Sequence, residues 1–268
     1  MVATFTIVPY FVVPIVEQRM TFHPGRYDDT RPQRLPPTAS DVTVPTSDGV
    51  HLNGWFFTAA APRNGVTVLF LHGNSGTLNL VTNDATFLQK HGFDVFAIDY
   101  RGYGRSEGAS TSEATLLRDG QAARRYLTIE RGVAPDSIAL FGQSLGTVPA
   151  ADLATSAPCR ATVLMAPLGS AKRQTRDVLP WLPDWFDMWM QSPLDTLGKI
   201  GHARCPVLVV HGDRDRTIAM AQGIDVYKAA REPKKLIVVP GGGHAPQLYR
   251  GDFFVEDVLA FLIGQPSR

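Results

Sequence analysis

The sequence predicts an α/β fold: a mostly parallel sheet with helices on both faces. From about residue 65 onward, Val/Ile/Leu-rich runs alternate with helix-like stretches, as in repeated strand–helix units. The runs are apolar throughout instead of alternating with polar residues, which indicates strands buried on both faces. With 268 residues, the chain has the length of one large domain, or of one domain carrying an insertion.

The elements can be followed in order along the chain. An irregular lead-in rich in Pro and Arg covers residues 20–40. Residues 41–57 alternate apolar and polar positions around Ser-Asp-Gly, which predicts a β-hairpin. A helix in residues 111–132 has a Ser/Thr start suited to an N-cap. The other predicted elements are strands at 65–73, 93–99, 136–142, 160–167, 205–212 and 234–241, and helices at 78–91, through Ala151 and at 251–264.

Composition and charge narrow the functional class. Hydrophobic residues make up 44% of the chain and charged residues 19%, as in a soluble globular protein. The formal net charge is +1 and no basic run occurs, so we expect no nucleic-acid partner. Two cysteines, without a CxxC or a His/Cys cluster, give no reason to expect a metal. Taken alone, Cys159 and Cys205 are best interpreted as two unpaired thiols.

The N-terminal residues 1–16 carry no charge and leave two alternatives open. The run is shorter than the roughly 20 apolar residues of a spanning helix, and Pro9 and Pro14 would each remove a helix hydrogen bond. A basic n-region and a small-residue cleavage site are both missing, so secretion is not favoured. We expect a packed or surface-lying segment, or a short or truncated membrane anchor. The expected location is the cytoplasm, with possible membrane association through residues 1–16.

Ser144 is the candidate nucleophile. It follows the predicted strand at residues 137–141 and opens a helix, and Gly142 and Gly146 flank it in a G-x-S-x-G pattern. In a strand–turn–helix context, such a serine sits on a sharp turn and exposes its hydroxyl above the sheet. The alternative is a plain glycine-rich helix start, which needs no chemistry.

A serine nucleophile needs a base, and the base needs a carboxylate partner. His244 follows the last predicted strand in a glycine-rich loop, so it can reach back over the sheet. Asp213 and Asp215 both follow an earlier strand, and we favour Asp215 as the partner because it lies deeper in the loop. Asp213 is better suited to capping the loop or the following helix. His72 and His211 each end a strand and are expected to position loops.

Acyl transfer also needs donors for the developing oxyanion. The backbone N–H of Leu145, directly after the nucleophile, is the first candidate. The second is the backbone N–H of Asn74, in the loop after the first parallel strand. The Asn74 side chain is a further candidate donor, although an asparagine here is equally a turn residue.

The motifs and their order resemble the α/β-hydrolase superfamily from about residue 41 to the end. They are most similar to the branch of serine hydrolases with BEM46-like and ABHD13/ABHD17-like members, where HGN, D-x-R-G-x-G-x-S, G-x-S-x-G and HG-x-x-D stand in this order. The resemblance implies an eight-stranded, mostly parallel sheet with a small cap between strands six and seven. It also implies ester or thioester hydrolysis, often of lipid-like or acyl-bearing substrates, without a cofactor or metal. The segment at residues 17–24 resembles the one that follows an N-terminal membrane anchor in several members.

The implied sheet has a consequence for the cysteines. Strands six and seven would be neighbours, which would bring Cys159 and Cys205 together near the amino ends of those strands. A disulfide between them is therefore an alternative hypothesis to the two free thiols.

The cap expected at about residues 170–200 contains three of the four tryptophans. A single helix that carries all three tryptophans is not expected, because it would contain Pro183 and proline is poorly tolerated inside a helix. A helix starting near Pro183 would instead place one tryptophan before the helix and group the others on one face. Three interpretations of that face remain open: it packs against the sheet as ordinary core, it forms an apolar wall that binds an acyl group, or it contacts a membrane. The candidate substrate-binding residues are Trp181, Trp185, Met188 and Trp189.

These observations predict a serine hydrolase that acts on a small-molecule ester or acyl substrate. The catalytic residues would be Ser144, His244 and Asp215, working through an acyl-enzyme. Two alternatives remain: a peptidase or amidase with the same triad, and a catalytically idle binding module with this fold.

Overall fold

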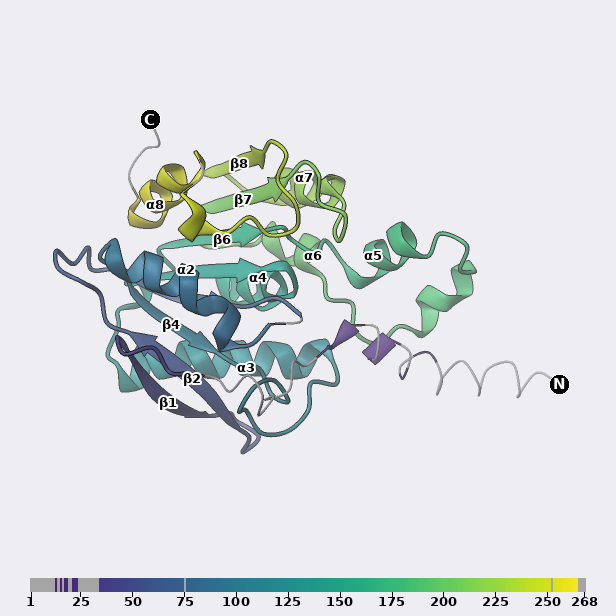
Figure 1. Cartoon of the computed structure of the whole chain (residues 1–268). Helices are drawn as coiled ribbons and strands as arrows, with labels where there is room; N and C mark the ends of the chain where they lie inside the picture. Colours follow the sequence, from purple (N-terminus) through teal and green to yellow (C-terminus); the bar gives the residue numbers. More distant parts are fainter. Residues whose placement is uncertain are drawn as a thin grey trace.

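An eight-stranded sheet forms the centre of the computed structural model, which describes residues 13, 15, 17–18, 21–23, 34–74, 76–251 and 253–264 (Figure 1). The strands are β1 (Ala39–Pro45), β2 (His51–Phe57), β3 (Thr67–Leu71), β4 (Asp94–Ile98), β5 (Ile138–Gln143), β6 (Ala161–Met165), β7 (Val207–Gly212) and β8 (Lys234–Val239). Their order across the sheet is β1-β2-β4-β3-β5-β6-β7-β8. Only the pairs β1–β2 and β2–β4 are antiparallel. The predicted mostly parallel sheet is confirmed.

Helices cover both faces of this sheet (Figure 1). The described α-helices are α2 (Leu78–Lys90), α3 (Glu113–Arg125), α4 (Thr147–Ser156), α5 (Ala171–Val178), α6 (Thr196–Ile200), α7 (Met220–Ala229) and α8 (Val255–Ile263). Apolar side chains of α2 and α8 pack with one face of the strands, and those of α3, α4 and α7 pack with the other. The strands are therefore buried from both sides, which is why β3 and β6 consist of buried residues throughout.

Two local predictions are confirmed by the backbone. The Ser-Asp-Gly stretch forms the turn between β1 and β2, and Gly49 takes a left-handed φ of 82° there. Ser112 is the N-cap of α3: its hydroxyl accepts the N–H of Thr115, whose own hydroxyl accepts the N–H of Ser112. A π-helical segment, Tyr126–Glu130, continues α3 and ends two residues before the predicted end of the helical stretch at residue 132.

The segment between β6 and β7 carries α5, a 3₁₀ segment at Asp184–Trp189 and α6. In Figure 1, α5 and the following chain project beyond the ends of the parallel strands. We call residues 166–195 the cap. Its outer surface is unusually apolar, since Trp181 is 74% exposed, Met188 72% and Trp185 50%.

Described residues before β1 pack against the cap and the body of the domain. Phe22 is buried in the main core, and the Glu17 carboxylate accepts the backbone N–H groups of Gln191 (2.8 Å) and Ser192 (2.9 Å) in the cap. None of the described helices is long and apolar enough to cross a bilayer. Most of the predicted anchor, residues 1–12, 14 and 16, lies outside the described part of the chain.

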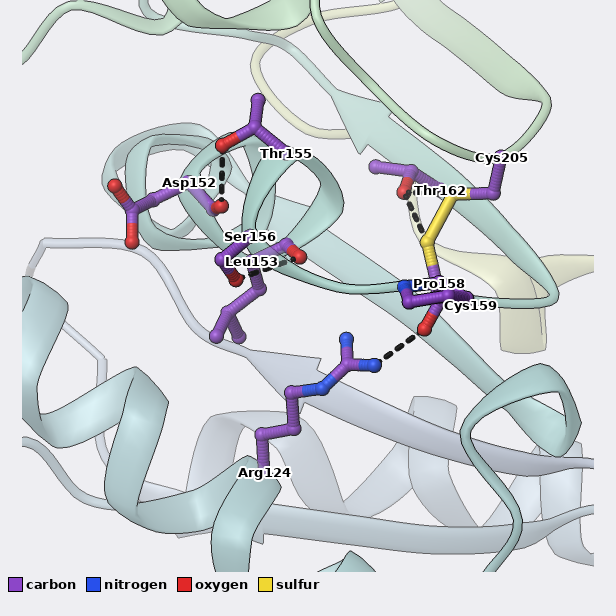
Figure 2. The surroundings of a disulfide bond; sticks show 9 residues. All are labelled: Arg124, Asp152, Leu153, Thr155, Ser156, Pro158, Cys159, Thr162 and Cys205. Carbon is purple, nitrogen blue, oxygen red and sulfur yellow. Dashed lines mark hydrogen bonds between the residues drawn. A yellow bond between two sulfur atoms is a disulfide. The ribbon is translucent and has the colours of Figure 1, made fainter.

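A disulfide joins Cys159 and Cys205, with Cα atoms 5.5 Å apart (Figure 2). The interpretation of two unpaired thiols is therefore wrong for this structure. The reason is the sheet order: β6 and β7 are parallel neighbours, and each cysteine stands two residues before its strand. Both side chains are thus brought together at the amino ends of these strands, far from the edge where Ser144 follows β5.

Candidate active site

Ser144 occupies a sharp turn between β5 and the 3₁₀ segment Ser144–Gly146 that leads into α4. Its φ of 52° lies in the left-handed region, which is strained for a residue with a side chain. The flanking glycines permit this turn. A Cβ on Gly146 would lie 2.0 Å from the carbonyl oxygen of Leu71, and a Cβ on Gly142 would lie 2.6 Å from that of Gly146. Neither position can accept a larger residue.

The structure brings the three predicted triad residues together. Nε2 of His244 lies 3.0 Å from Oγ of Ser144, and Nδ1 of His244 lies 2.8 Å from Oδ2 of Asp215. Because a carboxylate can only accept, Nδ1–H donates to Asp215 and leaves Nε2 as the acceptor for the serine hydroxyl. This is the tautomer that a general base for Ser144 requires.

Asp215 is held as a buried, ionised carboxylate. Its Oδ1 accepts the backbone N–H groups of Thr217 (2.8 Å) and Ile218 (3.0 Å). His211 lies behind it, with Nε2 3.3 Å from Oδ2 and 3.0 Å from the Ile218 carbonyl oxygen. Burial raises the pKa of Asp215, but the bonds from His211, His244 and the two backbone groups outweigh burial and hold that pKa well below its ordinary value.

Asp213 has a different partner: its Oδ1 accepts the N–H of Gly241 at 2.7 Å, which ties the loop after β7 to the loop after β8. His72 also positions a loop. Its buried ring donates from Nδ1 to the carbonyl oxygen of Gly73 (2.8 Å), and burial lowers the pKa of His72 to about 4, so the ring is neutral. Both residues therefore shape the loops around Ser144 and lie outside the His244 hydrogen-bond chain.

The predicted oxyanion loop passes directly beside Ser144, since a Cβ on Gly73 would lie 3.3 Å from the serine Cβ. The Asn74 side chain is engaged elsewhere. Its Oδ1 accepts the Tyr103 hydroxyl and the His23 N–H, each at 2.9 Å, and its Nδ2 lies 2.8 Å from the ring nitrogen Nδ1 of His23. The backbone N–H groups of Asn74 and Leu145 are thus the candidate donors, and the Asn74 side chain is a loop anchor.

A cavity of about 590 Å³ opens above Ser144 and His244. The cap supplies its apolar wall, formed by Leu168, Val178, Leu179, Phe186, Met190 and Leu194. Within the described residues, no group of three or more His, Cys, Asp or Glu side chains is arranged to hold a metal ion.

The predicted substrate-binding residues do not line this cavity: Trp181, Trp185, Met188 and Trp189 are all absent from its walls. Trp181 lies before the helical segment and is exposed. Residues 184–189 form a 3₁₀ segment, where residues three apart share a face, instead of the predicted α-helix. Trp185 and Met188 share an exposed face of this segment, whereas Phe186 lies on another face and lines the cavity.

The sequence comparison decides the family. The profile of a family described as "alpha/beta hydrolase fold" matches residues 66–199, half of the chain. The protein belongs to the α/β-hydrolase family. A protein of Mycobacterium tuberculosis, Rv2307c, is 33% identical over 247 residues, which are 92% of this chain and 87% of that protein. Human alpha/beta hydrolase domain-containing protein 17C is 35% identical over 192 residues, covering 71% of this chain and 56% of its own length. The expected ABHD17-like branch is confirmed.

Solved structures agree with this α/β-hydrolase architecture. An esterase from Pyrococcus furiosus, Pf2001, superposes with a TM-score of 0.72 at 21% identity and covers 90% of this chain and 96% of its own. An α/β-hydrolase from Vibrio vulnificus gives 0.70 at 21% identity, covering 84% and 81%. At these identities the likeness concerns the fold.

Two parts of the wall of this α/β-hydrolase cavity were not predicted from the sequence. The chain before β1 contributes Glu17, Thr21 and His23 to its wall, and none of these residues was predicted to lie at the site. Asp84 of α2 and Gln247 after His244 contribute polar side chains. The only signal for Asp84 is a carboxylate among apolar residues on one face of a helix, which is too common a pattern to stand out.

Proposed function

We propose that the protein is a serine hydrolase that cleaves carboxylic esters or thioesters with apolar acyl groups. The observation that carries this proposal is the continuous hydrogen-bond chain from Ser144 Oγ through His244 to Asp215. The strained conformation of Ser144 and the apolar cap wall of the cavity support it. Hydrolases and esterases among the relatives and fold neighbours are consistent with it.

The reaction follows from these positions. Ser144 Oγ attacks the carbonyl carbon while His244 Nε2 takes the hydroxyl proton, and the oxyanion is bound by the backbone N–H groups of Leu145 and Asn74. The intermediate collapses to an acyl-enzyme as His244 returns the proton to the departing alcohol or thiol. Water, deprotonated by His244, then attacks the acyl-enzyme and releases the acid. Asp215 holds the His244 tautomer and stabilises its protonated form.

A p-nitrophenyl ester series from acetate to palmitate, combined with fluorophosphonate labelling, tests the proposal. We expect both hydrolysis and labelling in the wild type, and loss of both in Ser144→Ala. Ser137→Ala, at the opposite end of β5, is the matched control and should keep both. Absence of a Ser144-dependent label in folded protein would instead indicate an idle binding module. Faster cleavage of matched anilides than of esters would indicate an amidase.

A further inference from the structure

One wall of the cavity is polar and is built by α2 and by the chain after His244. Leu80 and Asp84 lie one helical turn apart on α2, and both line the cavity. Gln247 lines the same cavity three residues after His244. Asp84 is only 4% exposed, on the helix face that otherwise buries residues such as Val81 in the core.

Asp84 is a buried carboxylate that has no cationic partner in the described part of the chain. Within the described residues, no Lys, Arg or His side chain forms an ion pair with it. Its contacts are backbone groups: Oδ1 accepts the N–H of Tyr249 at 3.1 Å, and the N–H of Leu248 also approaches. An ionised carboxylate has about four acceptor positions, so this one keeps spare capacity. Buried charges in proteins are ordinarily paired, which makes this one an exception that calls for a partner.

Gln247 adds a second acceptor to the lining of the same cavity. Its Oε1 is buried and has no hydrogen-bond partner in the described part of the chain. Gln247 and Tyr249 are two residues apart, and Tyr249 is the residue bonded to Asp84, so the two acceptors belong to one wall. A buried acceptor left without a donor costs about 1–3 kcal/mol. A cation in this part of the cavity would supply the countercharge that Asp84 lacks, and the partial negative charge of Gln247 Oε1 would add to the attraction.

The position of this wall identifies the part of the substrate that it meets. His244 Nε2 returns a proton to the leaving oxygen, so the alcohol portion of an ester must lie beside the His244 loop. Ala245 and Gln247 continue that loop along the cavity, and Asp84 holds it from α2. The apolar cap wall remains for the acyl portion.

We propose that Asp84 and Gln247 bind a protonated amine on the alcohol portion of the substrate, which makes esters of amino alcohols the preferred substrate class. This inference rests on the proposed ester hydrolysis. The amine donates its N–H to the Asp84 carboxylate, and the partial negative charge of Gln247 Oε1 adds to the attraction for the positive charge. The esterified oxygen then lies next to His244.

Two esters of matched shape test the proposal: 2-(dimethylamino)ethyl butanoate and 3-methylbutyl butanoate, in which a CH group replaces the protonated nitrogen. The measured quantity is the ratio of their kcat/KM values at pH 7.5. The amine also makes the alcohol a better leaving group, so the wild-type ratio alone does not show that the amine is bound. The decisive result is therefore the change in this ratio between the wild type and each variant. In Asp84→Asn, which keeps an oxygen for the Tyr249 N–H, we expect the ratio to fall about tenfold or more, the effect of losing a hydrogen bond to a charged group.

Gln247→Met, similar in shape but without the acceptor, should lower the same ratio, and it decides the matter if Asp84→Asn fails to fold. Asp136→Asn, an exposed charge change before β5, is the matched control and should leave the ratio within about twofold of the wild type. A ratio that stays at the wild-type value in both Asp84→Asn and Gln247→Met would overturn the proposal while leaving ester hydrolysis intact. Failure of the wild type to cleave either ester, together with no Ser144-dependent label, would overturn the proposed function itself.

Discussion

Replacing Asp84 with Asn should make the protein more stable at neutral pH. The carboxyl group lies on the buried face of α2, and burial raises the pKa of Asp84 from an ordinary 3.8 to about 6, against the lowering effect of the Tyr249 and Leu248 N–H groups. An asparagine has nearly the same shape and can accept the Tyr249 N–H, but it carries no charge.

The sign of the effect follows from proton binding. The folded protein keeps its Asp84 proton up to about pH 6, whereas the unfolded chain releases it near 3.8, so unfolding becomes easier as the pH rises between these values. One pKa unit is worth about 1.4 kcal/mol, so the full loss is about 3 kcal/mol above pH 6. The Asp84→Asn variant does not suffer this loss. Its stability relative to the wild type should therefore increase by about 3 kcal/mol between pH 4 and pH 7.

Urea unfolding at intervals from pH 4 to pH 8, followed by both circular dichroism and tryptophan fluorescence, measures this difference. The comparison between pH values removes any constant effect of introducing an amide. Asp136→Asn, which changes an exposed carboxylate, should show no comparable trend. A difference between Asp84→Asn and the wild type that is flat, or that falls as the pH rises, would refute the reasoning.

Three further predictions concern the cavity, the disulfide and the triad. Phe186→Ala should lower the ratio of kcat/KM for p-nitrophenyl decanoate to that for p-nitrophenyl acetate about tenfold, because Phe186 lines the cavity. Trp181→Ala, which changes an exposed aromatic residue of the cap, should change this ratio less than about twofold. Replacing Cys159 and Cys205 by Ser should lower the free energy of unfolding in urea by about 2–4 kcal/mol. The rate in the proposed ester assay at 25 °C should persist, because the disulfide is remote from Ser144. Asp215→Asn should lower kcat by about 10,000-fold in the same ester assay through the wrong imidazole tautomer. Its stability deficit should shrink as the pH falls below 3.8, because the lowered pKa of Asp215 contributes stability only while the carboxylate is ionised.

The sheet and the strained turn at Ser144 were predictable because both depend on short stretches of sequence. A strand buried on both faces must be apolar throughout, as in β3 and β6, and this pattern is visible without any partner strand. The strained turn at Ser144 requires glycines at fixed offsets, and a Cβ on Gly146 would collide with the carbonyl oxygen of Leu71. Both signals are local, so they survive in a single sequence.

The walls of the cavity depend on contacts that no local pattern contains. Glu17 bonds Gln191 across 174 positions of the chain, and neither residue is unusual in its own surroundings. The inward face of the segment Asp184–Trp189 was predicted wrongly. The pattern grouped Trp185 and Met188 on one face, as the structure does, but it does not show which face meets the cavity. Pro183 correctly indicated where the turn begins, but it could not determine whether Trp185 or Phe186 faces inward.

The position of Asp84 connects stability with substrate choice. As a structural anchor for the Tyr249 N–H, an asparagine would serve as well, and it would avoid the cost of a buried charge. A carboxylate at this place gains an advantage only if a cation enters the cavity, since the interaction of opposite charges is strongest where water is excluded. In the proposed reaction, the acyl group would lie against the cap wall that contains Phe186 and Met190. Because the two walls come from separate elements, α2 and the cap, selectivity for the alcohol and for the acyl chain should change independently when either wall is altered.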